Sequence, residues 1–210
     1  MTQGKFITLE GGEGAGKSTQ VKRLADFLRT KGREVVQTRE VGGSPAAEEI
    51  RTFWLLKGEG HWDPLSELFL IMAARREHLV KTVFPALARG AWVVCDRFVD
   101  STRVYQGIAQ GLGSTLVESV YRGVAPGFEA DLTLLLDLPV ETGLERMRAR
   151  RGQDDRYQQK PVAFHQKLRD AYLDLARNHA QRFRVIDAAA DADSVALDIT
   201  RVVGERFGDL

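Results

Sequence analysis

Gly11-Gly12-Glu13-Gly14-Ala15-Gly16-Lys17-Ser18 is the stretch that decides the fold of this 210-residue chain. It fits the pattern G-x-x-x-x-G-K-[ST], in which backbone N–H groups surround phosphate oxygens. A strand-like run at residues 5–10 precedes it, and a helical pattern through Val21, Leu24 and Leu28 follows it. Because strand, glycine-rich loop and helix form the context in which this motif binds phosphate, the sequence predicts a nucleotide site here.

The residue types in this motif indicate what each one does. The Lys17 ammonium would reach the β- and γ-phosphates of ATP, and the Ser18 hydroxyl would ligate Mg²⁺. The alternative is a glycine-rich turn with a solvated lysine, and the strand and helix on either side argue against it. The residues that we expect to bind the phosphates are Gly11, Gly12, Glu13, Gly14, Ala15, Gly16, Lys17, Ser18 and Thr19.

Short strand-like runs alternate with longer helical patterns along the rest of the chain. The predicted strands are residues 5–10, 34–38, 91–95, 132–136 and 184–186. A helix is expected from Pro45, with Ser44 as its N-cap, and helical patterns occupy 64–89, 140–150 and 161–182. This alternation predicts one α/β domain, residues 1–210, with a three-layer P-loop NTPase fold of five parallel strands and helices on both faces.

Composition excludes several other classes of function. The 30 basic and 29 acidic side chains nearly cancel, so no cationic field for nucleic-acid binding is expected. The longest apolar run, residues 132–138, falls far short of the ~20 residues that cross a bilayer, and the N-terminus lacks the pattern of a secretory leader. The one cysteine, Cys95, cannot form an intramolecular disulfide, which fits a reducing compartment. Together these features predict a cytoplasmic protein that binds neither nucleic acid nor membrane.

A second phosphate-binding feature follows the third predicted strand. Asp96 and Arg97 come directly after this apolar strand, at the sheet edge where ligands of parallel α/β folds bind. A planar guanidinium matches two phosphate oxygens better than a lysine does. A GTPase is excluded because its base-reading Asn-Lys-x-Asp segment is missing: the one asparagine, Asn178, precedes His179.

Three longer segments resemble those of thymidylate kinases. They are residues 10–19, the run Asp96-Arg97-Phe98 that leads to Ser101-Thr102-Arg103-Val104-Tyr105-Gln106-Gly107, and residues 148–157. The second is the most specific, since other monophosphate kinases do not usually carry it, and the likeness extends from about residue 6 to 202. The resemblance implies transfer of the γ-phosphate of ATP to dTMP with Mg²⁺, in a homodimer.

The resemblance also implies roles for single residues around the transferring phosphate. The catalytic residues would be Lys17, Glu13, Asp96, Arg97 and Arg151. Of these, Arg97 would clamp the dTMP phosphate, and Arg151 would reach the transferring group from an arginine-rich lid at about residues 148–160. Ser18 would ligate Mg²⁺, and Asp96 with Glu10 would hold the water-bound Mg²⁺ or orient the acceptor. No general base is required, because a phosphate monoester with a second pKa near ~6 is largely dianionic at neutral pH.

On the acceptor side, the resemblance nominates residues that would recognise thymidine. Arg75 would bind a thymine carbonyl, Thr102 the ring N3–H, and Tyr105 would leave no room for a ribose 2′-hydroxyl. The full substrate-binding set is Glu40, Arg51, Arg75, Arg97, Ser101, Thr102 and Tyr105. Three positions depart from the family pattern: Val41 replaces a common proline, Ile71 a common aromatic residue, and Gln158 a common glutamate.

Two alternatives to a dTMP kinase remain. One is another nucleoside monophosphate kinase that accepts UMP or CMP, since the three departures bear on the choice of substrate more than on the reaction. The other is a switch that binds ATP and phosphorylates no small acceptor. The pair Asp96-Arg97 argues against the switch, because a switch needs no second phosphate clamp.

Overall fold

A parallel sheet forms the centre of the molecule. The structure, a computed structural model, describes residues 4–56, 61–149, 157 and 160–208. Within these residues five strands pair in parallel, and every predicted strand is confirmed to within one residue at each end. Their order across the sheet is β2 (Val35–Arg39), β3 (Trp92–Asp96), β1 (Phe6–Glu10), β4 (Leu132–Asp137), β5 (Phe183–Asp187).

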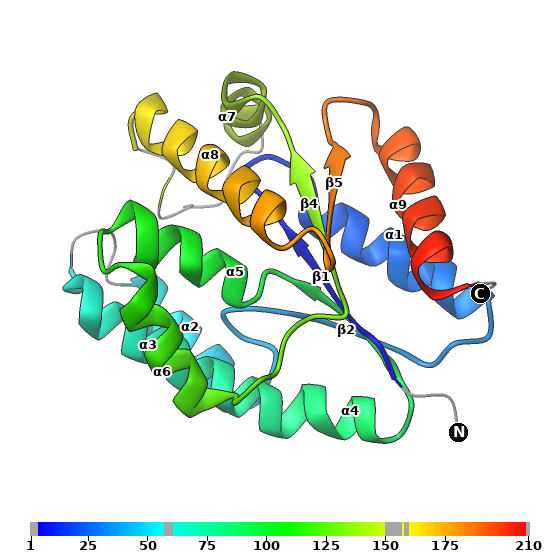
Figure 1. The fold of residues 1–210 in the computed structure, drawn as a ribbon, viewed down its shortest axis with the longest axis horizontal. Helices are drawn as coiled ribbons and strands as arrows, with labels where there is room; N and C mark the ends of the chain where they lie inside the picture. The colour runs from blue at the N-terminus through cyan, green and yellow to red at the C-terminus, as the bar shows by residue number, and fades with distance from the viewer. Residues whose placement is uncertain (1–3, 57–60, 150–156, 158–159, 209–210) are drawn as a thin grey trace.

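One face of the sheet is covered by the first and last helices. In Figure 1, α1 (Lys17–Thr30) and α9 (Ala192–Phe207) lie together on the right-hand side of the sheet. Alternate residues of β1 point to opposite faces, so Ile7 and Leu9 are fully buried against these two helices. The central strands β3, β1 and β4 are mostly apolar because both faces of the sheet are covered there, whereas the edge strands β2 and β5 carry polar, exposed residues.

Helices from the middle of the chain cover the opposite face (Figure 1). Phe6 of β1 is fully buried here in an apolar cluster that includes Leu68, Met72 and Val117. The elements on this side are α3 (Pro64–His78), the π-helical turn η1 (Leu79–Val83), α4 (Phe84–Ala88), α6 (Ser114–Val124) and α8 (Val162–Asn178). The predicted α/β fold with helices on both faces is therefore confirmed.

The helices differ from the sequence prediction in four respects. The pattern predicted at 64–89 is α3, η1 and α4 in succession, and the one predicted at 161–182 already ends at Asn178. Ser44 precedes α2 (Pro45–Leu56), but its buried hydroxyl has no hydrogen-bond partner among the described residues and does not cap the helix. The sequence prediction does not include α5 (Val99–Thr102), η2 (Arg103–Ala109), α6 or α9.

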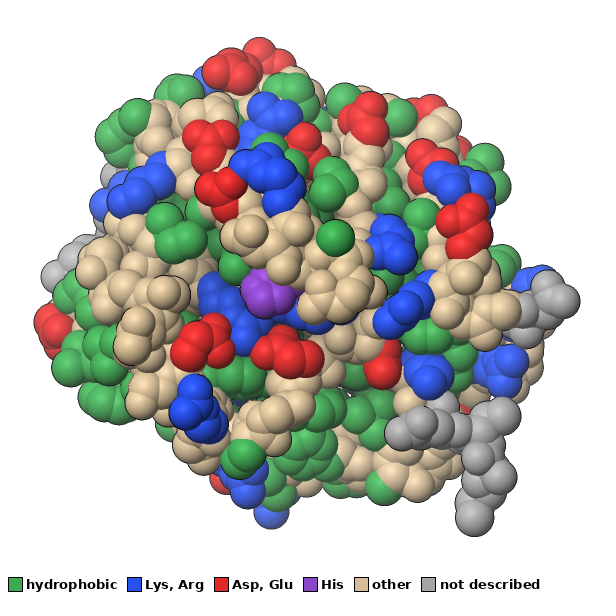
Figure 2. All heavy atoms as spheres, viewed as in Figure 1, with side chains coloured by type: hydrophobic (Ala, Val, Ile, Leu, Met, Phe, Trp, Pro, Cys, Tyr) green, Lys and Arg blue, Asp and Glu red, His purple; other side chains and the backbone are tan. Residues whose placement is uncertain are grey.

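The face of the molecule seen in Figure 2 is mixed in charge. Figure 2 shows basic and acidic side chains interspersed over the viewed face, as the near-neutral composition predicts. Across the part of the chain that the structure describes, no helix combines the length and the apolar character needed to span a membrane.

Candidate active site

The loop after β1 is held in shape by its own lysine. The Lys17 ammonium donates to the carbonyl oxygens of Gly11 (3.1 Å) and Gly12 (2.8 Å). Gly14 has a φ of +74°, and a Cβ placed there would lie 2.1 Å from the carbonyl oxygen of Gly143. Only glycine fits this left-handed, close-packed position, so the loop rests directly on α7 (Val140–Ala149).

The carboxyl end of β3 lies beside this loop. Leu9 of β1 pairs with Asp96, and the Arg97 N–H donates to the Leu9 carbonyl (3.0 Å). The Ser18 hydroxyl donates to Asp96 Oδ2 across 2.6 Å. Mg²⁺ prefers oxygen ligands and keeps several waters and substrate phosphates in its shell, so a hydroxyl and a carboxylate on one side fit it. Among the described residues no cluster of three or more His, Cys, Asp or Glu side chains forms a self-sufficient metal site.

Glu10 does not join this oxygen pair. Its carboxylate is fully buried and accepts from the Phe98 N–H (2.7 Å), the Ser101 hydroxyl (2.6 Å) and the Tyr172 hydroxyl (3.2 Å). These bonds fix the backbone just after Arg97 and the first turn of α5. Both of its oxygens already accept hydrogen bonds within the protein, which argues against a metal ligand here, and the expected role of Glu10 at the metal stays a prediction.

The environment of Glu10 favours its protonated form. Burial, followed by the charge of Asp100, raises the pKa of Glu10 from 4.5 to about 7, against the lowering effects of Ser101 and Arg97. The folded chain therefore binds a proton that the unfolded chain releases. The stability that this provides is complete below about pH 4.5 and is lost as the pH rises through about 7.

We expect Glu10→Gln to flatten the fall of melting temperature with pH between about pH 5 and 8, because glutamine does not titrate. Its amide oxygen can still accept from the Phe98 N–H. Differential scanning calorimetry over this pH range measures the slope, and Glu145→Gln, at an exposed position of α7, serves as the control. An unchanged slope in Glu10→Gln would show that Glu10 titrates normally in the folded protein.

Arg97 is the most extensively bonded cation of the site. Its Nη1 donates to the Gly11 carbonyl (3.2 Å), Ser101 Oγ (3.1 Å) and the Tyr172 hydroxyl (3.3 Å). Its Nη2 donates to Glu13 Oε1 (2.7 Å) and the Tyr105 hydroxyl (3.4 Å). Burial opposes the charge, but Tyr105 and Glu13 outweigh it and hold the Arg97 pKa well above its ordinary value. Arg97 is thus a fixed cation whose side chain remains 20% exposed.

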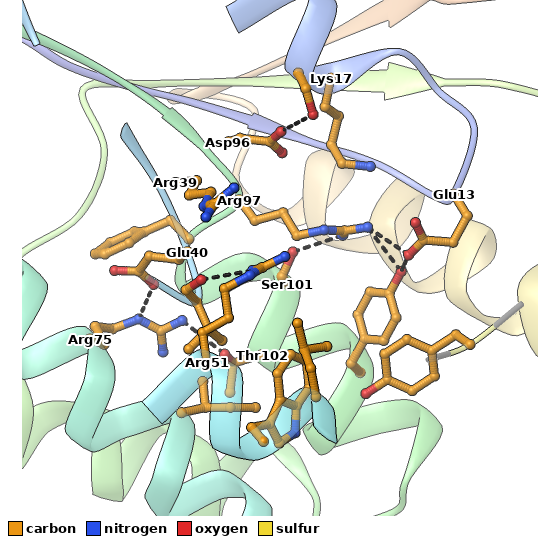
Figure 3. Close-up of a pocket in the computed structure, with 18 of the residues that line it drawn as sticks. Glu13, Lys17, Arg39, Glu40, Arg51, Arg75, Asp96, Arg97, Ser101 and Thr102 are labelled. Atoms are coloured by element: carbon orange, nitrogen blue, oxygen red, sulfur yellow. Dashed lines mark hydrogen bonds and ion pairs between the residues drawn. The ribbon is translucent and has the colours of Figure 1, made fainter. Parts of the chain in front are cut away.

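One cavity connects the two cationic groups. Figure 3 shows Lys17 and Arg97 reaching into it from neighbouring elements, with Glu13 beside the Arg97 guanidinium. The cavity has a volume of about 530 Å³, within the usual range for small-molecule sites. The predicted site residues that line it are Glu13, Gly14, Gly16, Lys17, Ser18, Glu40, Arg51, Arg75, Asp96, Arg97, Ser101, Thr102 and Tyr105.

Other predicted residues lie elsewhere. Gly11 and Gly12 line a smaller neighbouring cavity, Ala15 is buried in the core, and Thr19 is exposed on α1. The lid residue Arg151, with most of the segment 148–160 and the departure Gln158, lies outside the described residues. Its assignment stays a prediction.

The acceptor side of the cavity combines buried polar groups with apolar walls. Arg75 is 2% exposed, and its Nη2 donates to Thr102 Oγ1 (2.9 Å). Arg51 Nη1 donates to the Val41 carbonyl (2.7 Å), so this arginine supports the loop after β2 as well as facing the cavity. Ile71 also lines the cavity and offers an apolar side chain where the family commonly has an aromatic ring.

Sequence reasoning missed several lining residues, among them Trp54, Met147 and Gln106. Gln106 lies within the motif of residues 101–107, so its place in that motif could have marked it as a residue of the site. Trp54 and Met147 lie on amphipathic helices, where a residue facing a cavity has the same spacing as one facing the core.

The fold and this shared cavity, with a cationic group on either side, define a P-loop phosphotransferase. A family model described as thymidylate kinase matches residues 9–199. The chain belongs to the thymidylate kinase family.

Individual relatives agree with this assignment. The thymidylate kinase of Caulobacter vibrioides is 50% identical over 208 residues, which cover 99% of this chain and all of that protein. That of Ruegeria pomeroyi is 49% identical over 200 residues, covering 95% of this chain and 94% of its own. The crystal structure of thymidylate kinase from Ehrlichia chaffeensis superposes with a TM-score of 0.78 at 33% identity, covering 96% of this chain and 99% of that one.

Proposed function

We propose that the cavity holds both substrates at once, with ATP on the loop around Lys17 and the dTMP phosphate on Arg97. The reaction itself follows from the family: a thymidylate kinase transfers the γ-phosphate of ATP to dTMP and yields dTDP and ADP. The observation that carries the placement is that Lys17 and Arg97 line one cavity at the carboxyl edge of the sheet.

Alignment and charge neutralisation account for the catalysis. In phosphoryl transfer, negative charge spreads over the oxygens of the moving group, and fixed cations on either side of it stabilise that charge. Lys17 would neutralise the β/γ side and Arg97 the acceptor side. The internal bonds of Arg97 hold its guanidinium in one orientation, so little reorganisation is needed when the acceptor phosphate binds.

Ser18 and Asp96 would hold Mg²⁺ on the ATP side, where a bound Mg²⁺ supplies charge neutralisation for the phosphates. We expect Asp96→Asn to raise the Mg²⁺ concentration for half-maximal activity by about tenfold, because one anionic ligand is lost. The measurement is initial rate against Mg²⁺ concentration at saturating ATP and dTMP.

The matched control for this titration is Glu10→Gln, which also replaces a carboxylate at a strand end. It should leave the Mg²⁺ requirement unchanged, since the Glu10 oxygens are occupied by Phe98 and Ser101. A larger rise in Glu10→Gln than in Asp96→Asn would contradict the assignment of the ligands.

The thymine base would lie against Arg75, Thr102 and Ile71, with the sugar near Tyr105. Arg75 and Thr102 provide donors and an acceptor on one wall, which suit the carbonyl and N3–H edge of a thymine. The Tyr105 hydroxyl donates to Glu13 Oε1 (2.7 Å), which holds the ring at the cavity wall. Exclusion of a ribose hydroxyl by shape alone supplies about a hundredfold discrimination at most.

An ADP-release assay with dTMP, dUMP, UMP, CMP and AMP tests the proposal. We expect turnover to be fastest with dTMP and weaker with dUMP, which lacks only a methyl group worth about 1–3 kcal/mol in a fitted pocket. Preference for UMP or CMP would refute the placement of the base. Turnover with none of them would favour an ATP-binding switch.

We also propose a cytoplasmic homodimer of single-domain chains, each comprising residues 1–210. In support, Phe69 and Leu65 of α3 are 54% and 37% exposed, whereas Met72 of the same helix is buried in the core. Exposed large apolar side chains on one helix are typical of a subunit contact. The family resemblance points to the same helical packing.

A further inference from the structure

A continuous chain of hydrogen bonds runs from β2 to the acceptor wall of the cavity. Thr38 Oγ1 lies 2.7 Å from His78 Nε2, and His78 Nδ1 lies 2.9 Å from Glu40 Oε1. The other oxygen of Glu40 accepts from Arg75 Nε (2.7 Å), and Arg75 Nη2 donates to Thr102 Oγ1 (2.9 Å). Figure 3 shows the last part of the chain, with Arg75 between Glu40 and Thr102.

The chain is removed from solvent. The side chains of His78, Glu40 and Arg75 are 0%, 3% and 2% exposed. Burial alone would raise the pKa of Glu40, but Arg75 and then His78 outweigh it and keep this pKa below its ordinary value. Glu40 is therefore an anionic acceptor for both of its neighbours, and water cannot replace either of them readily.

The charge of Glu40 fixes the role of each imidazole nitrogen. Because a carboxylate only accepts, His78 Nδ1 must carry a hydrogen and donate to it. In the neutral ring Nε2 is then an acceptor, which takes the Thr38 hydroxyl hydrogen. His78 thus holds one oxygen of Glu40, and the other oxygen remains free to orient the Arg75 guanidinium.

The loop after β2 packs on the same imidazole. Gly43 has a φ of +84°, and a Cβ there would lie 2.4 Å from Thr38 Oγ1 and 2.5 Å from His78 Cδ2. The Gly43 carbonyl accepts from Thr82 Oγ1 (2.7 Å), and its N–H donates to Glu48 Oε1 (2.8 Å). His78 therefore supports the loop that carries Glu40 as well as the carboxylate itself.

We propose that His78 is a positioning residue for dTMP, which fixes Glu40 so that Arg75 keeps its guanidinium aimed at the base edge. His78 lines no part of the cavity and acts only through Glu40 and Arg75. This inference rests on the proposed placement of the thymine base beside Arg75.

Two substitutions of His78 separate positioning from packing. His78→Asn retains an N–H at the place of Nδ1, whereas His78→Leu removes it and leaves Glu40 Oε1 buried without that donor. We expect His78→Leu to weaken dTMP binding about tenfold or more, and His78→Asn to stay within about threefold of the wild type. The kcat at saturating dTMP and the Kd for ATP should change less than about threefold. Titration calorimetry with dTMP and with ATP measures the two affinities.

Leu79→Ala is the control for stability. Leu79 is the next residue, is fully buried, and belongs to the apolar cluster under β3. Its truncation should lower the melting temperature and leave the dTMP affinity unchanged. If His78→Leu behaves like Leu79→Ala, or if His78→Asn loses as much dTMP affinity as His78→Leu, the inference is wrong.

Arg75→Met distinguishes failure of this inference from failure of the base placement. We expect Arg75→Met to weaken dTMP binding, and His78→Leu added to it to cause no further loss, because both act through one guanidinium. Loss in Arg75→Met with none in His78→Leu would overturn the role of His78 alone. Unchanged dTMP affinity in Arg75→Met would overturn the base placement and this inference together.

Discussion

Replacing Lys17 with alanine is expected to lower kcat about a thousandfold, while the Kd for dTMP stays within about threefold of the wild type. Two effects add. The cation for the β/γ-phosphates is lost, and the carbonyls of Gly11 and Gly12 lose the ammonium that draws the loop together. Steady-state kinetics with varied ATP, together with calorimetric titration of dTMP, measure both quantities.

The environment of Lys17 explains why the effect should be large. Burial lowers the pKa of the Lys17 ammonium, Arg97 lowers it further, and Glu13 acts in the opposite direction. A charge that is 92% removed from solvent interacts strongly with an anion brought beside it. Lys22→Ala, at an exposed position of the same helix, is the matched control and should keep the wild-type kcat. A Lys17→Ala enzyme with kcat intact would exclude Lys17 from the transfer step.

Replacing Arg97 with lysine is expected to lower kcat/KM for dTMP by about two orders of magnitude, with ATP affinity nearly unchanged. Lysine keeps the charge but loses the fork of donors that joins Ser101 on one side to Glu13 on the other. Arg97→Ala should cost more, because it also leaves the Glu13 carboxylate without this partner. Initial rates with varied dTMP at saturating ATP provide the measurement.

Arg89→Lys is the matched control for this prediction. Arg89 precedes the opposite end of β3 and pairs with Glu34 at the surface, where the two side chains are 48% and 59% exposed. The same substitution there should leave kcat/KM unchanged. Equal losses of dTMP and ATP affinity in Arg97→Lys would contradict the assignment of Arg97 to the acceptor.

The sequence was sufficient for the sheet and for the phosphate loop because both depend on local patterns. Apolar runs with defined ends located the strands, and the motif around Lys17 required the strand and helix that flank it. The start of α9 also carries a local signal in the sequence: Asp191 accepts from the N–H groups of Asp193 and Ser194 as an N-cap.

What could not be read was the direction in which side chains point at the sheet edge. Arg97 has a φ of +67°, rare for a residue with a Cβ, and this turn of the backbone depends on the strands packed around it. Glu10 and Asp96 both end strands, yet one is sealed inside the protein and the other faces the cavity. The burial of Glu40 with His78 and Arg75 joins residues far apart in sequence, so no local spacing indicates it.

The central claim, that Lys17 and Arg97 hold the phosphates of two substrates in one cavity, has a direct test. The test is calorimetric titration of a ligand that joins adenosine and thymidine through a chain of five phosphates. We expect one molecule to bind per chain and to be displaced by ATP and by dTMP alike, with affinity lost in both Lys17→Ala and Arg97→Lys. Binding of the linked ligand that saturating dTMP leaves undiminished would place the two cations in separate sites and contradict the claim.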